Sequence, residues 1–267
     1  MQVESRSVRS PCTVRIRRLP FRSNLPRPLP ADPHPATGLQ AAIVDLDGTL
    51  VDTLDDFVAA LDAMLADFGW PPLDRAFVAR TVGKGSEHLL RRALAEAGAA
   101  NDATTDLFDT AMARYQQHYR RVNGRHARVY PGAAQGLARL EAHGLRLACV
   151  TNKPTTFARE LLQAMGLAGH FRHVFGGDAF ARRKPDPLPL LEACAALGSD
   201  PRRTLMVGDS RNDAQAARAA GCPVVLVSYG YNHGEPVQDV DADAYVDRID
   251  EIALDAFACA SGSRGDL

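Results

Sequence analysis

Short apolar runs and stretches of helical periodicity alternate along most of the chain. Five runs rich in apolar residues have the length of strands, and they lie at 41–44, 145–150, 173–175, 204–207 and 224–227. Continuous runs of this kind are typical of strands buried on both faces of a parallel sheet. Helical spacing, with a glycine directly after each stretch, occurs at 136–143, 157–165, 188–197 and 214–220. The alternation predicts right-handed βαβ units and therefore an α/β fold with a Rossmann-like parallel sheet.

Residues 53–128 interrupt this alternation with helical signals alone. Apolar residues recur there at helical spacing, first at Leu54, Val58, Leu61 and Leu65. Further helices are expected at 73–82, from Ser86 as N-cap to Gly98, and at 103–121. We therefore expect a helical cap at 55–128, inserted after the first strand of a core that comprises residues 39–54 and 129–267.

The first 38 residues have a different composition. They contain seven arginines, seven prolines and only two acidic residues, Glu4 and Asp32. Proline at this density prevents a regular helix, and a charged segment with few apolar residues cannot bury a core of its own. We expect residues 1–38 to be a disordered extension. An arginine-rich start also resembles organelle transit peptides, and a translation start assigned too far upstream would give the same composition, so both alternatives stay open.

Composition excludes several classes of function. The formal net charge is −1, so the chain has no overall basic footprint for nucleic acid. No apolar run reaches the ~18 residues that span a bilayer. The five cysteines are scattered without a Cys-x-x-Cys pair, which favours a reducing, cytoplasmic compartment. Only three lysines occur among 28 arginines, so Lys84, Lys153 and Lys184 are each candidates for a specific role.

Two carboxylates follow the first apolar run. Asp45 and Asp47 lie two positions apart at its end, so their side chains point the same way, roughly 6.6 Å apart along the chain. In open α/β sheets this end of the strands binds ligands. Two carboxylates aimed at one point repel each other unless a cation lies between them or one of them stays protonated. Gly48 lets the chain turn away at once and keeps its backbone close to whatever binds there.

Three more loops place polar side chains at the same edge of the predicted sheet. The second strand ends in Thr151 and Asn152, where a hydroxyl and free backbone N–H groups suit an anion. Prolines present Lys184 rigidly, and its ammonium can neutralise a phosphate oxygen and a carboxylate together. The run at 204–207 leads into Asp209 and Asp213, carboxylates of the kind that Mg²⁺ prefers. Taken singly, these features are explained equally well by a helix N-cap, a surface lysine and a solvated acidic turn.

Taken together, the four strand ends resemble the motifs of the haloacid dehalogenase-like (HAD) hydrolases. The first motif, Asp-x-Asp-Gly-Thr-Leu-x-Asp, begins at Asp45, and the other three fall in the family's order on Thr151, Lys184 and Asp209. The resemblance covers about residues 39–250. It implies a HAD core with a helical cap.

The resemblance also implies roles in catalysis. Asp45 is implied to be the nucleophile and Asp47 the general acid/base. Thr151 and Asn152 are implied to contact the phosphate, whereas Lys153 is expected to face solvent. Two other polar residues are expected to have no catalytic role: Cys149 is expected to pack within its strand, and His233 to face solvent on a loop.

A metal site follows from the same resemblance and from the chemistry of carboxylates. Mg²⁺ is expected to be held by Asp45, by the backbone carbonyl of Asp47 and by Asp209. Lys184 is expected to offset the charge of the nucleophile and of the phosphate. Asp213 is placed just outside the metal ligands, where it holds water or orients Lys184.

Motifs outside these four extend the likeness to a bacterial branch that hydrolyses 2-phosphoglycolate. They include Gly83-Lys84-Gly85-Ser86 in the cap, Tyr130-Pro131-Gly132, and Ser228-Tyr229-Gly230-Tyr231-Asn232. The likeness implies a Mg²⁺-dependent phosphomonoesterase that acts on a small phosphorylated metabolite through an aspartyl-phosphate. Gly83, Lys84 and Gly85 are expected to contact the substrate. The enzyme is expected to be a cytoplasmic monomer or homodimer.

Several alternatives stay open within this fold. Phosphatases of sugar phosphates, such as N-acetylmuramic acid 6-phosphate, share several of the outer motifs. A phosphomutase would have to exclude water from the aspartyl-phosphate. A phosphonate hydrolase uses a cap lysine as a Schiff base, and Lys84 is the only lysine in the expected cap. A dehalogenase lacks the second acid, so Asp47 argues against it, and an inactive binding protein should have lost one of the motif residues, none of which is missing.

Overall fold

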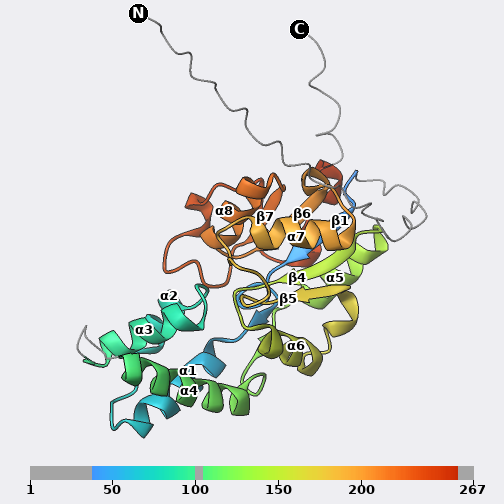
Figure 1. Cartoon of the computed structure of the whole chain (residues 1–267). Helices are drawn as coiled ribbons and strands as arrows, with labels where there is room; N and C mark the ends of the chain where they lie inside the picture. The colour runs from blue at the N-terminus through green and yellow to red at the C-terminus, as the bar shows by residue number, and fades with distance from the viewer. Residues whose placement is uncertain (1–37, 100–104, 258–267) are drawn as a thin grey trace, which may run out of the picture. The chain divides into compact units, whose positions relative to one another are not determined.

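The computed structural model describes residues 38–99 and 105–257 of the 267-residue chain (Figure 1). The predicted basic extension lies outside the described residues, apart from Gly38. Within them, six parallel strands form one sheet in the order β5-β4-β1-β6-β7-β8. The strands are β1 (Ala41–Val44), β4 (Arg146–Val150), β5 (His173–Phe175), β6 (Thr204–Gly208), β7 (Val224–Val227) and β8 (Ala244–Val246). The predicted α/β fold with a parallel sheet is therefore confirmed.

The edge strand β8 is the one strand of this sheet that the apolar pattern does not predict. Its three residues are all partly or fully exposed, and Tyr245 at its centre is 38% exposed. Ala244, Tyr245 and Val246 form an apolar run of only three residues, which periodicity alone does not distinguish from a loop.

Helices cover both faces of the sheet, as alternation of side chains along the strands requires. One face packs against α5 (Ala133–Ala142) and α6 (Thr155–Ala164), and the other packs against α7 (Leu188–Leu197) and α8 (Arg211–Ala220). In β1, Ala42 and Val44 belong to the first core cluster, whereas Ala41 and Ile43 belong to the second. All four β1 residues are fully buried, so the central strand is a rigid base for whatever follows it.

Between residues 52 and 128, the described residues form a layer of four helices, called the helical layer below. These helices are α1 (Leu54–Asp67), α2 (Arg75–Thr81), α3 (Ser86–Glu96) and α4 (Thr105–Val122). They enclose a third apolar cluster, in which Phe68 and Trp70 pack at the margin. The prediction that Ser86 is the N-cap of its helix is wrong. Gly85 holds that position with a φ of 89°, a conformation that favours glycine, and Ser86 is the first helical residue.

Two short strands join the helical layer to the core. β2 (Val51–Asp52) and β3 (Arg128–Val129) pair antiparallel, with Val51 opposite Val129 and Asp52 opposite Arg128. Strands of two residues are too short to carry a periodic pattern, which is why the sequence does not predict them. Asp56, at the start of α1, accepts hydrogen bonds from the backbone of Gly124 (2.6 Å) and His126 (2.8 Å). These bonds hold the outgoing and returning segments together.

Short 3₁₀ helices complete the described residues. They are Ala168–His170, Pro201–Arg203, Val237–Asp239, Ile249–Glu251 and Leu254–Phe257. Across the described ranges, we find no helix with both the length and the apolar character required to cross a bilayer.

Candidate active site

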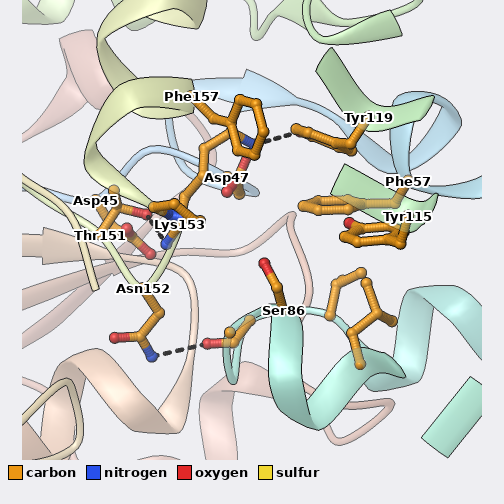
Figure 2. A pocket seen from close by; sticks show the side chains of 15 residues that line it. Asp45, Asp47, Phe57, Ser86, Tyr115, Tyr119, Thr151, Asn152, Lys153 and Phe157 are labelled. Carbon is orange, nitrogen blue, oxygen red and sulfur yellow. Dashed lines mark hydrogen bonds and ion pairs between the residues drawn. The ribbon is translucent and has the colours of Figure 1, made fainter. Parts of the chain in front are cut away.

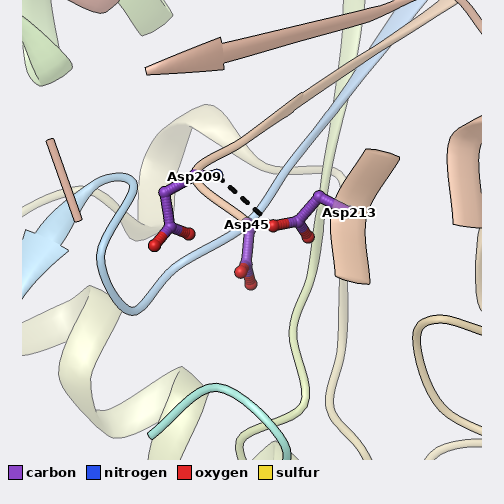
Figure 3. Close-up of side chains that lie close together, drawn as sticks. All are labelled: Asp45, Asp209 and Asp213. Atoms are coloured by element: carbon purple, nitrogen blue, oxygen red, sulfur yellow. Dashed lines mark hydrogen bonds between the residues drawn. The ribbon is translucent and has the colours of Figure 1, made fainter. Parts of the chain in front are cut away.

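Three acidic side chains meet at the carboxyl ends of β1 and β6 (Figure 3). Asp45 directly follows β1, Asp209 follows β6, and Asp213 comes from the first turn of α8. All three are buried, and one carboxylate oxygen from each lies within 4.8 Å of the others. Because neighbouring parallel strands end at one edge of the sheet, the two strand ends bring together residues that are more than 160 positions apart in sequence.

Lys184 neutralises part of this cluster. Its Nζ lies 2.9 Å from Oδ1 of Asp45 and 2.7 Å from Oδ1 of Asp213, and it donates a hydrogen bond to the carbonyl of Val150 at 2.7 Å. The other oxygen of Asp213 accepts bonds from the backbone and hydroxyl of Ser210 in the capping box of α8. Asp213 therefore fixes Lys184, and Lys184 in turn fixes Asp45.

The protonation of these groups follows from their burial. Burial raises the pKa of Asp45 to about 7, although the neighbouring Lys184 opposes the rise. Burial, together with the carboxylates of Asp213 and Asp45, also raises the pKa of Asp209 well above its ordinary value. For Lys184, burial lowers the pKa, but Asp213 and Asp45 outweigh that effect and the net shift is upward. The lysine is therefore held as an ammonium, whereas Asp45 and Asp209 are driven toward their protonated forms, because one ammonium cannot balance three buried carboxylates.

These residues fit a hard divalent cation. When all three acids are ionised, three carboxylates face one ammonium, and a divalent cation would relieve the excess of negative charge in place of protons. Carboxylate and carbonyl oxygens are the ligands that Mg²⁺ prefers. Two glycines let the backbone pack directly against Asp209, since a Cβ added at Gly48 or Gly230 would lie within 2.5 Å of its Oδ2. The close approach expected at Gly48 is thus an approach to Asp209.

Asp47 occupies a different environment from the acidic cluster. Its Oδ1 accepts a hydrogen bond from the Thr53 hydroxyl at 2.8 Å and another from Nζ of Lys153 at 2.9 Å. Lys153 is buried, with only 2% of its side chain exposed, so the expectation that it faces solvent is wrong. Its Nζ also donates to the Tyr119 hydroxyl and lies 4.8 Å from the centres of the Phe57 and Tyr119 rings. These rings come from the helical layer, so the residues next to Lys153 in sequence could not reveal its burial.

A cavity opens between these groups and the helical layer (Figure 2). Its polar wall comes from the core and comprises Asp45, Asp47, Thr151, Asn152 and Lys153. Its apolar wall comprises Phe57, Val82, Leu89, Tyr115, Tyr119, Pro154 and Phe157. The third part of the lining is the loop before α3, with Gly83, Gly85 and Ser86. Lys84 in the same loop is exposed and is not among the residues that line the cavity.

Asn152 connects the core to the loop before α3. Its side-chain amide donates to the carbonyl of Gly83 at 3.0 Å and to the carbonyl of Lys184 at 2.9 Å. The structure thus brings Asn152 to the cavity beside Thr151, but it directs the amide nitrogen to the backbone. Asn212 adds a weaker bond to the same Gly83 carbonyl at 3.3 Å.

His233 supports the same loop, and the expectation that it faces solvent is wrong. It is half-buried with a φ of 55°, and its Nε2 lies 3.3 Å from Nδ2 of Asn212. A Cβ added at Gly83 would lie 3.3 Å from the His233 ring, and burial lowers the pKa of that ring. Cys149 is buried in β4, as expected.

Comparison with known proteins shows the family of this chain. The family model for the haloacid dehalogenase-like hydrolases matches residues 42–227, which is more than half of the chain. The chain belongs to this family. Among its relatives, a protein from Thiobacillus denitrificans named phosphoglycolate phosphatase is 44% identical over 218 residues, or 81% of this chain and 95% of that protein. A protein of the same name from Rhodospirillum rubrum is 46% identical over 210 residues, or 78% of this chain and 87% of that protein.

Solved structures give the same picture. The crystal structure of a predicted phosphoglycolate phosphatase from Haemophilus somnus matches with a TM-score of 0.76 and 34% identity. The match covers 80% of this chain and 96% of that structure. Both the fold and the family inferred from the strand ends are therefore confirmed.

Proposed function

We propose that this protein is a Mg²⁺-dependent phosphoglycolate phosphatase, which hydrolyses 2-phosphoglycolate to glycolate and phosphate. The observation that carries the proposal is the pairing of two acids with two buried lysines at one cavity: Asp45 with Lys184, and Asp47 with Lys153. The names of the relatives supply the substrate. The helical layer would act as the cap over this cavity.

The first half of the reaction would use Asp45 as nucleophile. Its carboxylate attacks phosphorus in line, the bond to the leaving oxygen breaks, and an aspartyl-phosphate forms on Asp45. Asp47 gives its proton to that oxygen, so glycolate leaves as an alcohol. Lys184 stays beside Asp45 and offsets the negative charge that accumulates there.

The second half would reverse the role of Asp47. Now a carboxylate, it accepts a proton from a water molecule that attacks the phosphorus, and phosphate leaves while Asp45 is regenerated. Mg²⁺, held by Asp45, Asp209 and the carbonyl of Asp47, would supply positive charge beside the transferring phosphoryl group. Thr151 lines the cavity next to Asp45 and offers its hydroxyl to a phosphate oxygen.

The cavity supports a small leaving group with a second anionic end. Aromatic rings close the side opposite the acids, and the loop at Gly83, Gly85 and Ser86 forms the remaining wall. The backbone N–H groups and the Ser86 hydroxyl of that loop suit the carboxylate of glycolate. Lys84, exposed beside this wall, would add positive charge at the entrance rather than a contact within the cavity. This placement gives no support to a Schiff base at Lys84, as a phosphonate hydrolase would need.

The setting of the enzyme is part of the proposal. We place it in the cytoplasm as a monomer or homodimer acting on a small metabolite. The buried thiols of Cys149, Cys194 and Cys222 are compatible with a reducing compartment.

A substrate panel tests the proposal. Phosphate release should be measured with 2-phosphoglycolate, with N-acetylmuramic acid 6-phosphate, with other sugar phosphates and with an aryl phosphate, each in Mg²⁺ and in excess chelator. We expect the highest kcat/KM for 2-phosphoglycolate and loss of turnover in chelator. A clear preference for a sugar phosphate would move the assignment to that class, and activity that survives complete chelation would contradict the metal requirement.

A further inference from the structure

Lys153 has the contacts of a residue that organises the site. Its ammonium is buried and touches the carboxylate of Asp47 at 2.9 Å and the hydroxyl of Tyr119. It also lies over the Phe57 and Tyr119 rings. A buried ammonium is costly unless it is paired and hydrogen-bonded, so these partners hold it in one place.

The contacts of Asp47 are one-sided. Both the Lys153 ammonium and the Thr53 hydroxyl bind Oδ1, and among the described residues no side chain donates a hydrogen bond to Oδ2. One oxygen is thus anchored while the other is left for the substrate. Two donors on the same oxygen hold the carboxylate in one orientation. This orientation matters because proton transfer requires the two heavy atoms to approach within about 2.6–3.2 Å.

The anchor reaches into the helical layer. Tyr119 lies on α4, and its ring stacks on Phe57 of α1 with centroids 5.3 Å apart and meets Phe157 of α6 edge-on at 5.1 Å. Lys153 itself belongs to the loop after β4 that also carries Thr151. Movement of α4 would therefore change the support of Asp47 without touching Asp45 or Lys184.

We propose that Lys153 is a positioning residue that sets the orientation of Asp47, and that the Tyr119 hydroxyl holds Lys153 in place. The inference rests on the proposed phosphatase mechanism, in which Asp47 acts on the leaving oxygen. The position of the acid is then coupled to the placement of α4 through the chain of contacts Tyr119–Lys153–Asp47. Lys184 does not take part in this coupling, since the residues that it contacts come from the core.

Leaving-group dependence tests the inference. An alkyl phosphate such as 2-phosphoglycolate needs its leaving oxygen protonated, whereas an aryl phosphate with an acidic phenol does not. For Lys153→Met we expect single-turnover cleavage of the alkyl phosphate to slow about 100-fold, and the burst of phenolate from the aryl phosphate to slow less than tenfold. Tyr119→Phe, which keeps the ring but removes the hydroxyl, should show the same selectivity at about three- to tenfold.

Controls separate positioning from folding and from binding. Lys153→Arg keeps the charge and should recover part of the alkyl rate, while Tyr245→Phe on β8 makes the same chemical change far from the cavity and should leave both rates unchanged. Equal losses on the two phosphates, or a change in KM with kcat unaltered, would overturn the inference. If Lys153→Met does not fold, Tyr119→Phe decides the question alone. A parent protein that hydrolyses neither phosphate would refute the proposed function, a result distinct from equal losses in the variants.

Discussion

The two buried lysines of the site have the same exposure but different neighbours. Lys184 and Lys153 each expose 2% of their side chains and each pair with one of the two acids. The partners of Lys184 are Asp45, Asp213 and the Val150 carbonyl, all in the core. Lys153 instead lies among aromatic side chains of the helical layer.

This difference separates the site residues that are held by the core from those whose position depends on the helical layer. The proposed nucleophile, Asp45, and Asp209 directly follow buried strands whose positions are fixed by the register of β1, β4 and β6, and Lys184 and Asp213 reach them from a loop and a helix of the core. The proposed acid/base, Asp47, is bound by Lys153, which in turn contacts Phe57 of α1 and Tyr119 of α4. We infer that changes in the helical layer alter proton transfer and substrate choice, while changes in the core alter nucleophilic attack and stability.

The largest effect is expected for Asp45→Asn, which changes the part of the site that is built on the core. We expect phosphatase activity to fall more than about 1,000-fold, because Asp47, the other carboxylate among the described residues that line the cavity, is already bound to Lys153 and Thr53. The fold should persist, since a neutral side chain at this position relieves repulsion among buried acids. Phosphate release and a thermal unfolding curve measure the two effects. Turnover within tenfold of the parent would show that Asp45 is not the nucleophile.

The two lysines should also differ in stability. Lys184→Met leaves Asp45 and Asp213 buried without their cation, which we expect to cost about 3–5 kcal/mol in the metal-free protein. Lys153→Met leaves the carboxylate of Asp47 without its cation, but the Thr53 hydroxyl still contacts it, so this variant should cost about 1–3 kcal/mol. Urea unfolding of both variants gives the comparison. A larger loss for Lys153→Met would mean that the Asp47–Lys153 pair contributes more to stability than the contacts of Lys184 with Asp45 and Asp213.

Mg²⁺ and pH should change stability through the acidic cluster of Asp45, Asp209 and Asp213 in the core. Burial raises the pKa of Asp45 to about 7, so the folded metal-free protein binds a proton that the unfolded chain has already released, and stability should fall as pH rises from about 4 to about 7. Mg²⁺ binds the ionised carboxylates and should raise Tm by roughly 5–10 °C at a hundredfold excess over its Kd. Melting curves at pH 5 and pH 7.5, with and without Mg²⁺, should show a larger metal effect at the higher pH. A metal effect that shrinks with rising pH would contradict this account of the cluster.

The smallest expected effect concerns Lys84 at the entrance. Lys84→Ala should lower kcat/KM for 2-phosphoglycolate by about tenfold, the value of one partly screened charge contact, and should change the aryl phosphate much less. Both substrates should be measured on both proteins. Equal losses would show that Lys84 does not recognise the carboxylate.

The strand ends could be predicted from sequence because each of their residues is marked by its immediate neighbours. An apolar run followed at once by acids placed Asp45 and Asp209 at one edge of a parallel sheet, and the structure brings them together with Lys184. The four helices inserted after the first strand were predictable from their apolar spacing in the same way.

The surroundings of Lys153 and His233 could not be predicted in this way. The rings around Lys153 include one from Tyr119, 34 positions earlier, and His233 packs on a loop 150 positions away. Nothing in the residues beside either side chain indicates such a partner. The basic tail lies outside the described residues, and its prediction stays a prediction.

The pairing of β2 with β3 has a consequence for how such a protein can diversify. The chain leaves the core at Asp52 and returns at Arg128, and these two residues face each other across an antiparallel pair. Neighbouring strands lie only about 4.8 Å apart, so the chain leaves the core and returns to it at nearly the same point. The segment from Asp52 to Arg128 is therefore equivalent to one long hairpin loop between β2 and β3. Recombination could therefore exchange this loop for another without shifting the register of the core. A replacement without a hydroxyl in the place of Tyr119 would leave Lys153 with one partner fewer, so the core limits which insertions keep full activity.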